Sequence, residues 1–217
     1  MPADLSPKPE LLTGQSHHLD VEGWAVELPI IAIKPDFGIA LMMLIDMGVG
    51  FVAHAGARLA AHFSARKPDI VVGPATLGIP LAIEVTRALG LDRYVVLQKS
   101  PKLHLRDALV QEITSITSAG AQKLLLDRQA LPLLAGRRVL LVDDVVASGS
   151  SLAGALALLR KAGAQLVGIG AVLTEAHDWK ARLGADAGLV HGLAHIPQFA
   201  PVAGVWRPIP GSDIQSI

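Results

Sequence analysis

The sequence predicts an α/β fold with a mainly parallel central sheet and helices on both faces. From Asp69 onward, short apolar runs alternate with stretches of helical periodicity, which implies right-handed crossovers between parallel strands. The run Val139–Val142 has four consecutive apolar residues, as expected of a strand buried on both faces. The chain has 217 residues, 51% of them hydrophobic, which is enough for one sizeable core.

The predicted elements follow one another along the second two thirds of the chain. Strands are expected at 69–73, 94–98, 137–144, 164–174 and near 188–193, and helices at 78–90, 150–163 and 175–184. Gly90 and Gly163 stand at the C-cap positions of two of these helices. Upstream, the most apolar stretch, 38–57, is interrupted by Asp46 and His54, and it predicts a buried helix after a loop rather than a membrane span.

Composition narrows the class of protein. The 19 basic and 19 acidic side chains cancel, which argues against a general nucleic-acid binder but permits a local basic patch for one small anion. The chain has no cysteine, so disulfides, thiolate catalysis and cysteine-ligated metal are excluded. Residues 1–20 have no apolar run typical of a signal peptide. They predict a flexible tail containing His17 and His18, and a cytoplasmic location without membrane contact.

Three loops begin where predicted strands end: Gly73–Gly78, Lys99–Gln122 and Asp143–Ser151. They are built from glycine, small hydroxyl residues or charged residues. Ligands of open parallel sheets bind beyond the carboxyl ends of the strands. We therefore expect these loops to converge on one site.

The segment "VLLVDDVVASGSSL" indicates a sugar-phosphate ligand. Small residues at Ala147–Ser151 allow close approach of the backbone, and the N–H groups of the following helix favour an anion, usually phosphate. Asp143 and Asp144 could accept hydrogen bonds from a sugar diol. Together these features fit ribose 5-phosphate. A serine N-cap would explain one serine but not the whole run.

This segment closely resembles the phosphoribosyl pyrophosphate signature of the type I phosphoribosyltransferases. Response-regulator receivers also end a strand in "VDD", but there the pair lies near the start of the chain. The resemblance implies that Asp143 and Asp144 contact the ribose. It also implies that the 5-phosphate is held by Ala147, Ser148, Gly149, Ser150 and Ser151.

"VVGPATLGIPLA" resembles the pyrophosphate loop of the orotate and adenine enzymes, with a spelling nearest to the orotate group. The resemblance implies that Ala75, Thr76, Leu77 and Gly78 lie against the pyrophosphate. Many relatives have a lysine or arginine where Leu77 stands. A plain strand-to-helix turn is the alternative.

The stretch after "YVVLQ" resembles the flexible loop that closes over the site in adenine-type enzymes. The resemblance implies that Lys99 and Lys102 neutralise the leaving pyrophosphate and act with Asp144 in catalysis. A solvated basic turn is the alternative. Adenine-specific relatives place a glutamate before the second hairpin strand, whereas this chain has "SAG" at Ser118–Gly120.

The resemblance further implies a single domain, 21–217, with a core at about 48–174 and a small hood from 21–47 and 175–217. Phe37, Glu175 and His177 are candidates for contact with the base. Core packing is the alternative for Phe37, and a helix start is the alternative for Glu175 and His177.

The expected activity is Mg²⁺-dependent transfer of ribose 5-phosphate from phosphoribosyl pyrophosphate to a nucleobase nitrogen, by a homodimeric pentosyltransferase. A purine is favoured because the hood-loop resemblance spans more sequence. An orotate-type enzyme stays open, as does a non-catalytic regulator that senses phosphoribosyl pyrophosphate. Such regulators usually carry a basic N-terminal domain, and few basic residues precede Arg58.

Overall fold

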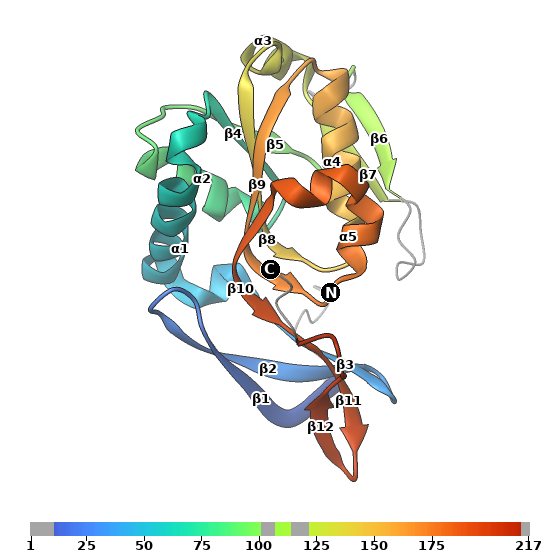
Figure 1. Cartoon of the computed structure of the whole chain (residues 1–217). Helices are drawn as coiled ribbons and strands as arrows, with labels where there is room; N and C mark the ends of the chain where they lie inside the picture. Colours follow the sequence, from blue (N-terminus) through green and yellow to red (C-terminus); the bar gives the residue numbers. More distant parts are fainter. Residues whose placement is uncertain (1–10, 101–106, 114–121, 214–217) are drawn as a thin grey trace, which may run out of the picture.

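The computed structural model describes residues 11–100, 107–113 and 122–213, and it confirms the predicted α/β class. Five parallel strands form the central sheet, in the spatial order β10-β9-β8-β4-β5 (Figure 1). Their bounds are β4 Ile70–Pro74, β5 Tyr94–Leu97, β8 Arg138–Val146, β9 Gln165–Glu175 and β10 Val190–Ile196. Each predicted strand is present, with ends shifted by a few residues.

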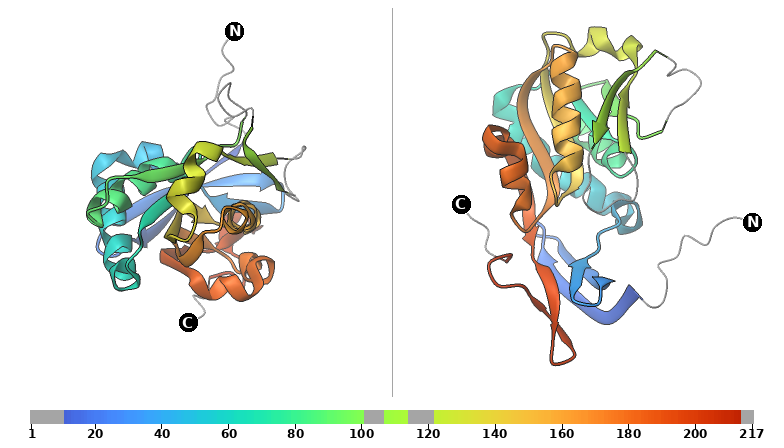
Figure 2. Two further views of the ribbon diagram at one scale, coloured as in Figure 1. Left: turned by 90° about the horizontal axis from the view of Figure 1, so that it is seen from above. Right: turned by 90° about the vertical axis from the view of Figure 1, so that its right-hand side faces the viewer.

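Helices cover both faces of this sheet (Figure 2). One face carries α1 (Gly48–Phe63) and α2 (Gly78–Ala88). The other carries α4 (Ser150–Lys161), α5 (Asp178–Leu183) and the hairpin of β6 (Leu109–Ile113) with β7 (Gln122–Leu126), while the short α3 (Leu131–Leu134) lies near one end. In β8, Leu140 packs in the first core and Leu141 in the second. Burial on both faces explains why Val139–Val142 in this strand is a continuous apolar run.

Helix α1 approaches the sheet closely because β9 has glycines beneath it. A Cβ atom added at Gly168 would lie 2.3 Å from Cε1 of Phe63. The helical stretch Leu44–Arg66 has the length and composition of a membrane span. Its side chains Phe51, Leu59 and Phe63 are nevertheless fully buried in the protein core, as in a core helix.

The buried helix predicted for the apolar stretch 38–57 is α1, which begins only at Gly48, so the first ten residues of the stretch lie outside the α-helix. β3 (Phe37–Ala40) is a strand, a loop follows, and Leu44–Met47 is a 3-10 turn that ends at Gly48 with φ +81°. β3 pairs with β2 and β11, so contacts distant in sequence override the local apolar signal.

A second, antiparallel sheet forms the hood from the two terminal segments, in the order β1-β2-β3-β11-β12. It lies beyond the carboxyl ends of the parallel strands (Figure 1). Its other members are β1 (Leu12–Asp20), β2 (Ala25–Lys34), β11 (Gln198–Val202) and β12 (Val205–Pro208).

The prediction of a flexible tail over residues 1–20 is wrong for Leu12–Asp20, because this segment forms strand β1 and pairs with β2. His17 packs edge-on against Phe199 of β11, with ring centroids 5.4 Å apart. The segment is mostly polar because one face of the sheet is exposed. It therefore lacks the clear alternation of apolar and polar residues that would have predicted a strand. The remainder of the predicted tail, 1–10, lies outside the described residues.

An ion pair joins the starts of β4 and β8, and it predicts a pH-dependent stability. Asp69 accepts hydrogen bonds from the backbone N–H of Arg138 (2.8 Å) and from its guanidinium (2.7 and 3.1 Å). These bonds lower the pKa of Asp69 from 3.8 to about 2. The carboxylate therefore stabilises the fold above pH 3.8, and this contribution disappears as the pH falls through about 2.

We expect Asp69→Asn to lower the melting temperature at pH 7, and the difference from wild type to shrink from pH 4 toward pH 2. Thermal unfolding followed by circular dichroism at several pH values measures this. Asp36→Asn, which changes an exposed carboxylate in the β2–β3 turn, is the control. A difference that stays constant down to pH 2 would contradict the assignment.

Candidate active site

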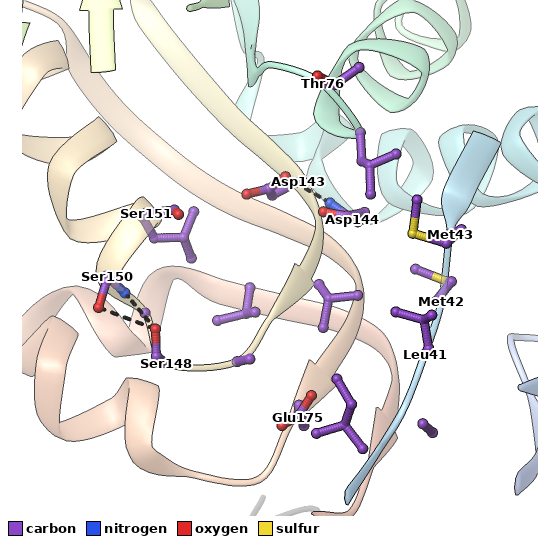
Figure 3. Close-up of a pocket in the computed structure, with 18 of the residues that line it drawn as sticks. Leu41, Met42, Met43, Thr76, Asp143, Asp144, Ser148, Ser150, Ser151 and Glu175 are labelled. Atoms are coloured by element: carbon purple, nitrogen blue, oxygen red, sulfur yellow. Dashed lines mark hydrogen bonds between the residues drawn. The ribbon is translucent and has the colours of Figure 1, made fainter. Parts of the chain in front are cut away.

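The three predicted loops meet at a cleft of about 380 Å³ (Figure 3). Thr76 and Leu77 line it from the β4–α2 loop, Lys99 from the end of β5, and the segment 143–152 from β8 and the start of α4. Residues 39–43 and Glu175 close it on the hood side. The cleft lies where the strands end, as parallel topology requires.

The turn before α4 has the geometry of a phosphate site. Gly149 is the N-cap of α4 with φ +73°, and a Cβ there would lie 3.1 Å from the Cα of Trp179. Only glycine suits both the conformation and the close approach. Ser150 is buried, and its N–H donates to the hydroxyl oxygen of Ser148 (3.3 Å). The first turn of α4 thus presents N–H groups and hydroxyls to the cleft, a combination suited to an anion.

The acidic pair lies in the middle of the cleft wall, two residues before the end of β8. Asp143 is only 8% exposed, and its Oδ1 accepts a hydrogen bond from the N–H of Asp144 (3.0 Å). Burial raises the pKa of Asp143 well above its usual range, the neighbouring Asp144 charge adds to this, and Lys99 opposes it. Ligand hydroxyls or a cation at this point would stabilise the ionised pair.

Gly78 lets the β4–α2 loop approach the acidic pair. A Cβ at this position would lie 2.8 Å from Cδ of Pro74 and 3.2 Å from Oδ1 of Asp143. Gly78 is also the first residue of α2. The start of this helix and the carboxylate of Asp143 are therefore packed directly against each other.

The donor set fits magnesium that is shared with a substrate. Among the residues that the structure describes, no group of three or more histidine, aspartate or glutamate side chains could hold a metal alone. Mg²⁺ is usually bound by one or two carboxylates together with waters and phosphate oxygens. Asp143 and Asp144 would hold such an ion together with a substrate's oxygens.

An apolar wall faces the acidic pair from the hood side. It is formed by Leu41, Met42 and Met43 in the loop after β3, and Glu175 stands at its end, where β9 terminates (Figure 3). Glu175 is 5% exposed, and its Oε1 accepts a hydrogen bond from Nε2 of Gln198 (3.0 Å). Burial raises the pKa of Glu175. Sequence reasoning missed the wall because it explained the apolar character of 38–57 by a buried helix.

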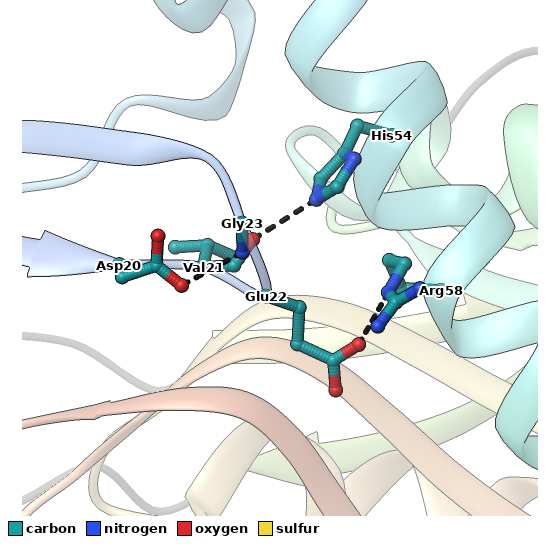
Figure 4. A network of polar contacts seen from close by, with 6 residues as sticks. All are labelled: Asp20, Val21, Glu22, Gly23, His54 and Arg58. Atoms are coloured by element: carbon teal, nitrogen blue, oxygen red, sulfur yellow. Dashed lines mark hydrogen bonds and ion pairs between the residues drawn. The ribbon is translucent and has the colours of Figure 1, made fainter.

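The hood is fixed to the core by the turn between β1 and β2 (Figure 4). Glu22 and Gly23 have φ values of +48° and +96°, as tight hairpin turns require. Nε2 of His54 on α1 donates to the carbonyl of Val21 (2.9 Å), and Arg58 on α1 pairs with Glu22. This docking holds the sheet, and with it the apolar wall, against the core.

Several predicted residues do not line the cleft. Phe37 lies at the β2–β3 turn opposite Lys34, so the base-contact prediction is not supported there. His177 is the N-cap residue of α5, and its ring stacks on that of His195 with centroids 5.1 Å apart. Helix α5 begins at Asp178, so the prediction of a helix over 175–184 began three residues too early.

The predicted pyrophosphate and hood-loop residues are only partly accounted for. Ala75 is buried, and its N–H donates to the carbonyl of Leu97 (2.8 Å) beside the cleft. Lys99 lines the cleft, whereas Lys102 and the "SAG" step at 118–120 lie outside the described residues. The expected hairpin is present as β6 and β7.

Comparison with known proteins agrees with this geometry. The family model "Phosphoribosyl transferase domain" matches residues 51–190. A xanthine phosphoribosyltransferase of Geobacillus thermodenitrificans is 32% identical over 142 residues (65% of this chain, 72% of the relative). An adenine phosphoribosyltransferase of Gluconobacter oxydans is 34% identical over 135 residues (62% and 72%). An orotate phosphoribosyltransferase of Chlorobium phaeobacteroides is 28% identical over 160 residues (71% of each).

Solved structures share the fold. The adenine phosphoribosyltransferase of Saccharomyces cerevisiae, solved with adenine and an iminoaltritol bisphosphate, superposes with a TM-score of 0.61 at 22% identity (84% of this chain, 96% of that chain). The Giardia lamblia enzyme with 9-deazaadenine gives a TM-score of 0.60 at 20% identity (84% and 94%). On the family match, the chain belongs to the type I phosphoribosyltransferases, which are pentosyltransferases acting on nucleobases.

Proposed function

We propose that this protein transfers ribose 5-phosphate from phosphoribosyl pyrophosphate to a ring nitrogen of a purine, with Mg²⁺ as cofactor. The observation that carries the proposal is a single cleft joining the Ser148–Ser151 turn, the acidic pair and an apolar wall that ends in Glu175. These parts suit a phosphate, a ribose diol and a planar uncharged base, in that order.

The proposed roles follow the order of the parts. The 5-phosphate binds at Ala147–Ser151, and the ribose hydroxyls bind to Asp143 and Asp144. The pyrophosphate lies against Ala75–Gly78 and near Lys99, with Lys102 as a further cation. Leu77 supplies no charge, so the backbone N–H groups at the start of α2 have a larger share of pyrophosphate binding.

The reaction is a displacement at the anomeric carbon. The bond from that carbon to the pyrophosphate oxygen breaks with its electron pair, a ring nitrogen forms the new bond with its lone pair, and the nitrogen's proton leaves to solvent or pyrophosphate. Positive charge grows on the ribose near Asp144, and negative charge grows near Lys99. When bound, Mg²⁺ supplies charge neutralisation at the pyrophosphate. The chain's own residues orient both reactants in line and exclude water.

The charge of the base end favours a purine over orotate, which carries its own carboxylate. Among the described residues that line the cleft, Lys99 is the only cation, and its charge acts on Asp143. The base end instead offers Glu175 and apolar side chains. Orotate remains the second candidate, because the "GPATLGIPLA" loop is nearest in spelling to orotate enzymes and one relative has that name.

A substrate panel tests the proposal: adenine, hypoxanthine, guanine, xanthine, orotate and uracil, each with phosphoribosyl pyrophosphate and Mg²⁺, followed by pyrophosphate release. We expect turnover with at least one purine and none with orotate. Turnover with orotate alone would overturn the purine assignment. Donor binding without turnover of any base would favour the sensing regulator, and absence of donor binding would overturn the whole proposal.

A homodimer in the cytoplasm completes the proposal. Exposed apolar side chains between the loop after β3 and the start of α1 support the dimer: Val49 is 89% exposed, Ile45 54% and Met43 37%. Sedimentation analysis of the purified chain measures the oligomeric state, and a monomer at micromolar concentration would contradict the dimer.

A further inference from the structure

Gln198, the first residue of β11, connects the hood sheet to the cleft. Its Nε2 donates to Oε1 of Glu175, the last residue of β9, over 3.0 Å. Among the described residues, the other carboxyl oxygen of Glu175 has no hydrogen-bond partner. One oxygen is therefore held by the protein, and the other remains available to a ligand in the cleft.

Gln198 is itself held by the C-terminal segment. Its backbone N–H donates to Oγ of Ser212 (3.1 Å), and that hydroxyl donates to the carbonyl of Ile209 (2.7 Å). Ser212 is 7% exposed although it lies near the end of the described chain. Such burial of a polar residue close to a terminus indicates that the segment is specifically anchored.

The C-terminal segment is also linked, through His195, to Thr174, the residue before Glu175. The carbonyl of Ser212 can only accept, so Nε2 of His195 donates to it (2.8 Å). In the neutral ring Nδ1 then accepts from the hydroxyl of Thr174 (2.9 Å). Burial lowers the pKa of His195, which favours this neutral form. The residues form a closed circuit: Thr174, His195, Ser212, Gln198 and Glu175.

We propose that Gln198 is a positioning residue for the nucleobase, which acts by fixing the Glu175 carboxylate at the base end of the cleft, and that the Ser212 anchor fixes Gln198. The inference rests on the proposed function, because it assigns Glu175 to a base N–H. A rigid, desolvated acceptor selects a neutral base with a donor at that edge and disfavours a base carrying its own carboxylate. The C-terminal segment thus contributes to base recognition without touching the base.

The test is Gln198→Met, which keeps the length of the side chain and removes its donor. We expect KM for the accepted purine to rise about tenfold, with KM for phosphoribosyl pyrophosphate within about twofold of wild type. Gln15→Met is the matched control, since Oε1 of Gln15 accepts from the N–H of Trp206 (2.7 Å) in the same sheet but does not line the cleft. It should affect stability without changing KM for the base.

A double-mutant cycle separates positioning from general support of the hood. In a Glu175→Gln background, Gln198→Met should change KM for the base less than about twofold, because the group it acts through has been altered. Ser212→Ala should raise KM for the base, as Gln198→Met does. If Gln198→Met does not fold, KM of the Ser212→Ala variant tests the positioning role in its place. Equal shifts in both KM values, independent effects in the cycle, or unchanged base KM in the folded variants would overturn the inference.

Failure of the inference is distinguishable from failure of the proposed function. If the wild-type protein binds no phosphoribosyl pyrophosphate in calorimetry, the proposed function fails. If the wild type turns over a purine and the Gln198 and Ser212 variants match it, only the positioning role fails.

Discussion

Replacing both cleft carboxylates, Asp143→Asn with Asp144→Asn, will abolish binding of phosphoribosyl pyrophosphate. Each carboxylate loses charge-assisted hydrogen bonds to the ribose hydroxyls, and the pair loses its attraction for a cation. Two such losses correspond to a decrease in affinity of at least about a hundredfold. Isothermal titration calorimetry with the donor and Mg²⁺ measures this directly.

The double variant should fold, because burial and mutual repulsion make the wild-type pair costly without a ligand. Removing a buried charge whose pKa is raised by burial will leave the melting temperature equal or higher. Asp36→Asn, an exposed carboxylate, is the control for affinity. Wild-type donor affinity in a folded double variant would refute the ribose assignment.

Gly78→Ala is expected to have the second-largest effect. The new methyl group would lie 2.8 Å from Cδ of Pro74 and 3.3 Å from the carbonyl oxygen of Val142, so the loop or β8 must shift. Overpacking of this kind costs about 1–3 kcal/mol, and a displaced loop would weaken donor affinity by about tenfold or more. Competition by pyrophosphate, measured as an inhibition constant, should weaken in parallel.

Gly50→Ala, near the start of α1, is the matched control for this change. A Cβ at Gly50 would meet only the side chain of Trp24, at the ordinary contact distance of 3.4 Å. The substitution should therefore leave donor affinity unchanged and stabilise the helix by about 0.5–1 kcal/mol. If Gly78→Ala bound the donor as tightly as Gly50→Ala does, the close approach would have no functional importance.

Local pattern predicted the elements of the parallel sheet and its helices, and the clearest signals came from strand segments that are buried on both faces. Ile70–Val72 in β4 and Val139–Val142 in β8 are continuous apolar runs because both faces of the sheet are covered there. The run of small residues around Gly149 indicated the turn before α4. The position of the cleft could be predicted from topology, because the carboxyl ends of parallel strands share one edge of a sheet.

The parts that local pattern missed depend on partners distant in sequence. β1 has a polar exposed face, so its pairing with β2 left only a weak signal. The wall at Leu41–Met43 follows β3, a strand stabilised by β11 from the other end of the chain. Gln198 contacts Glu175 from that same distant strand, and no spacing in the sequence indicates this pair.

The interleaving of the two chain ends also has a consequence for biosynthesis. β11 lies between β3 and β12, so β3 cannot complete its pairing until β11, Gln198–Val202, has left the ribosome. Until then the nascent chain exposes an open strand edge, which is prone to pairing with other chains. The turn before α4 and the acidic pair can assemble early during translation, whereas the hood side of the cleft is completed last.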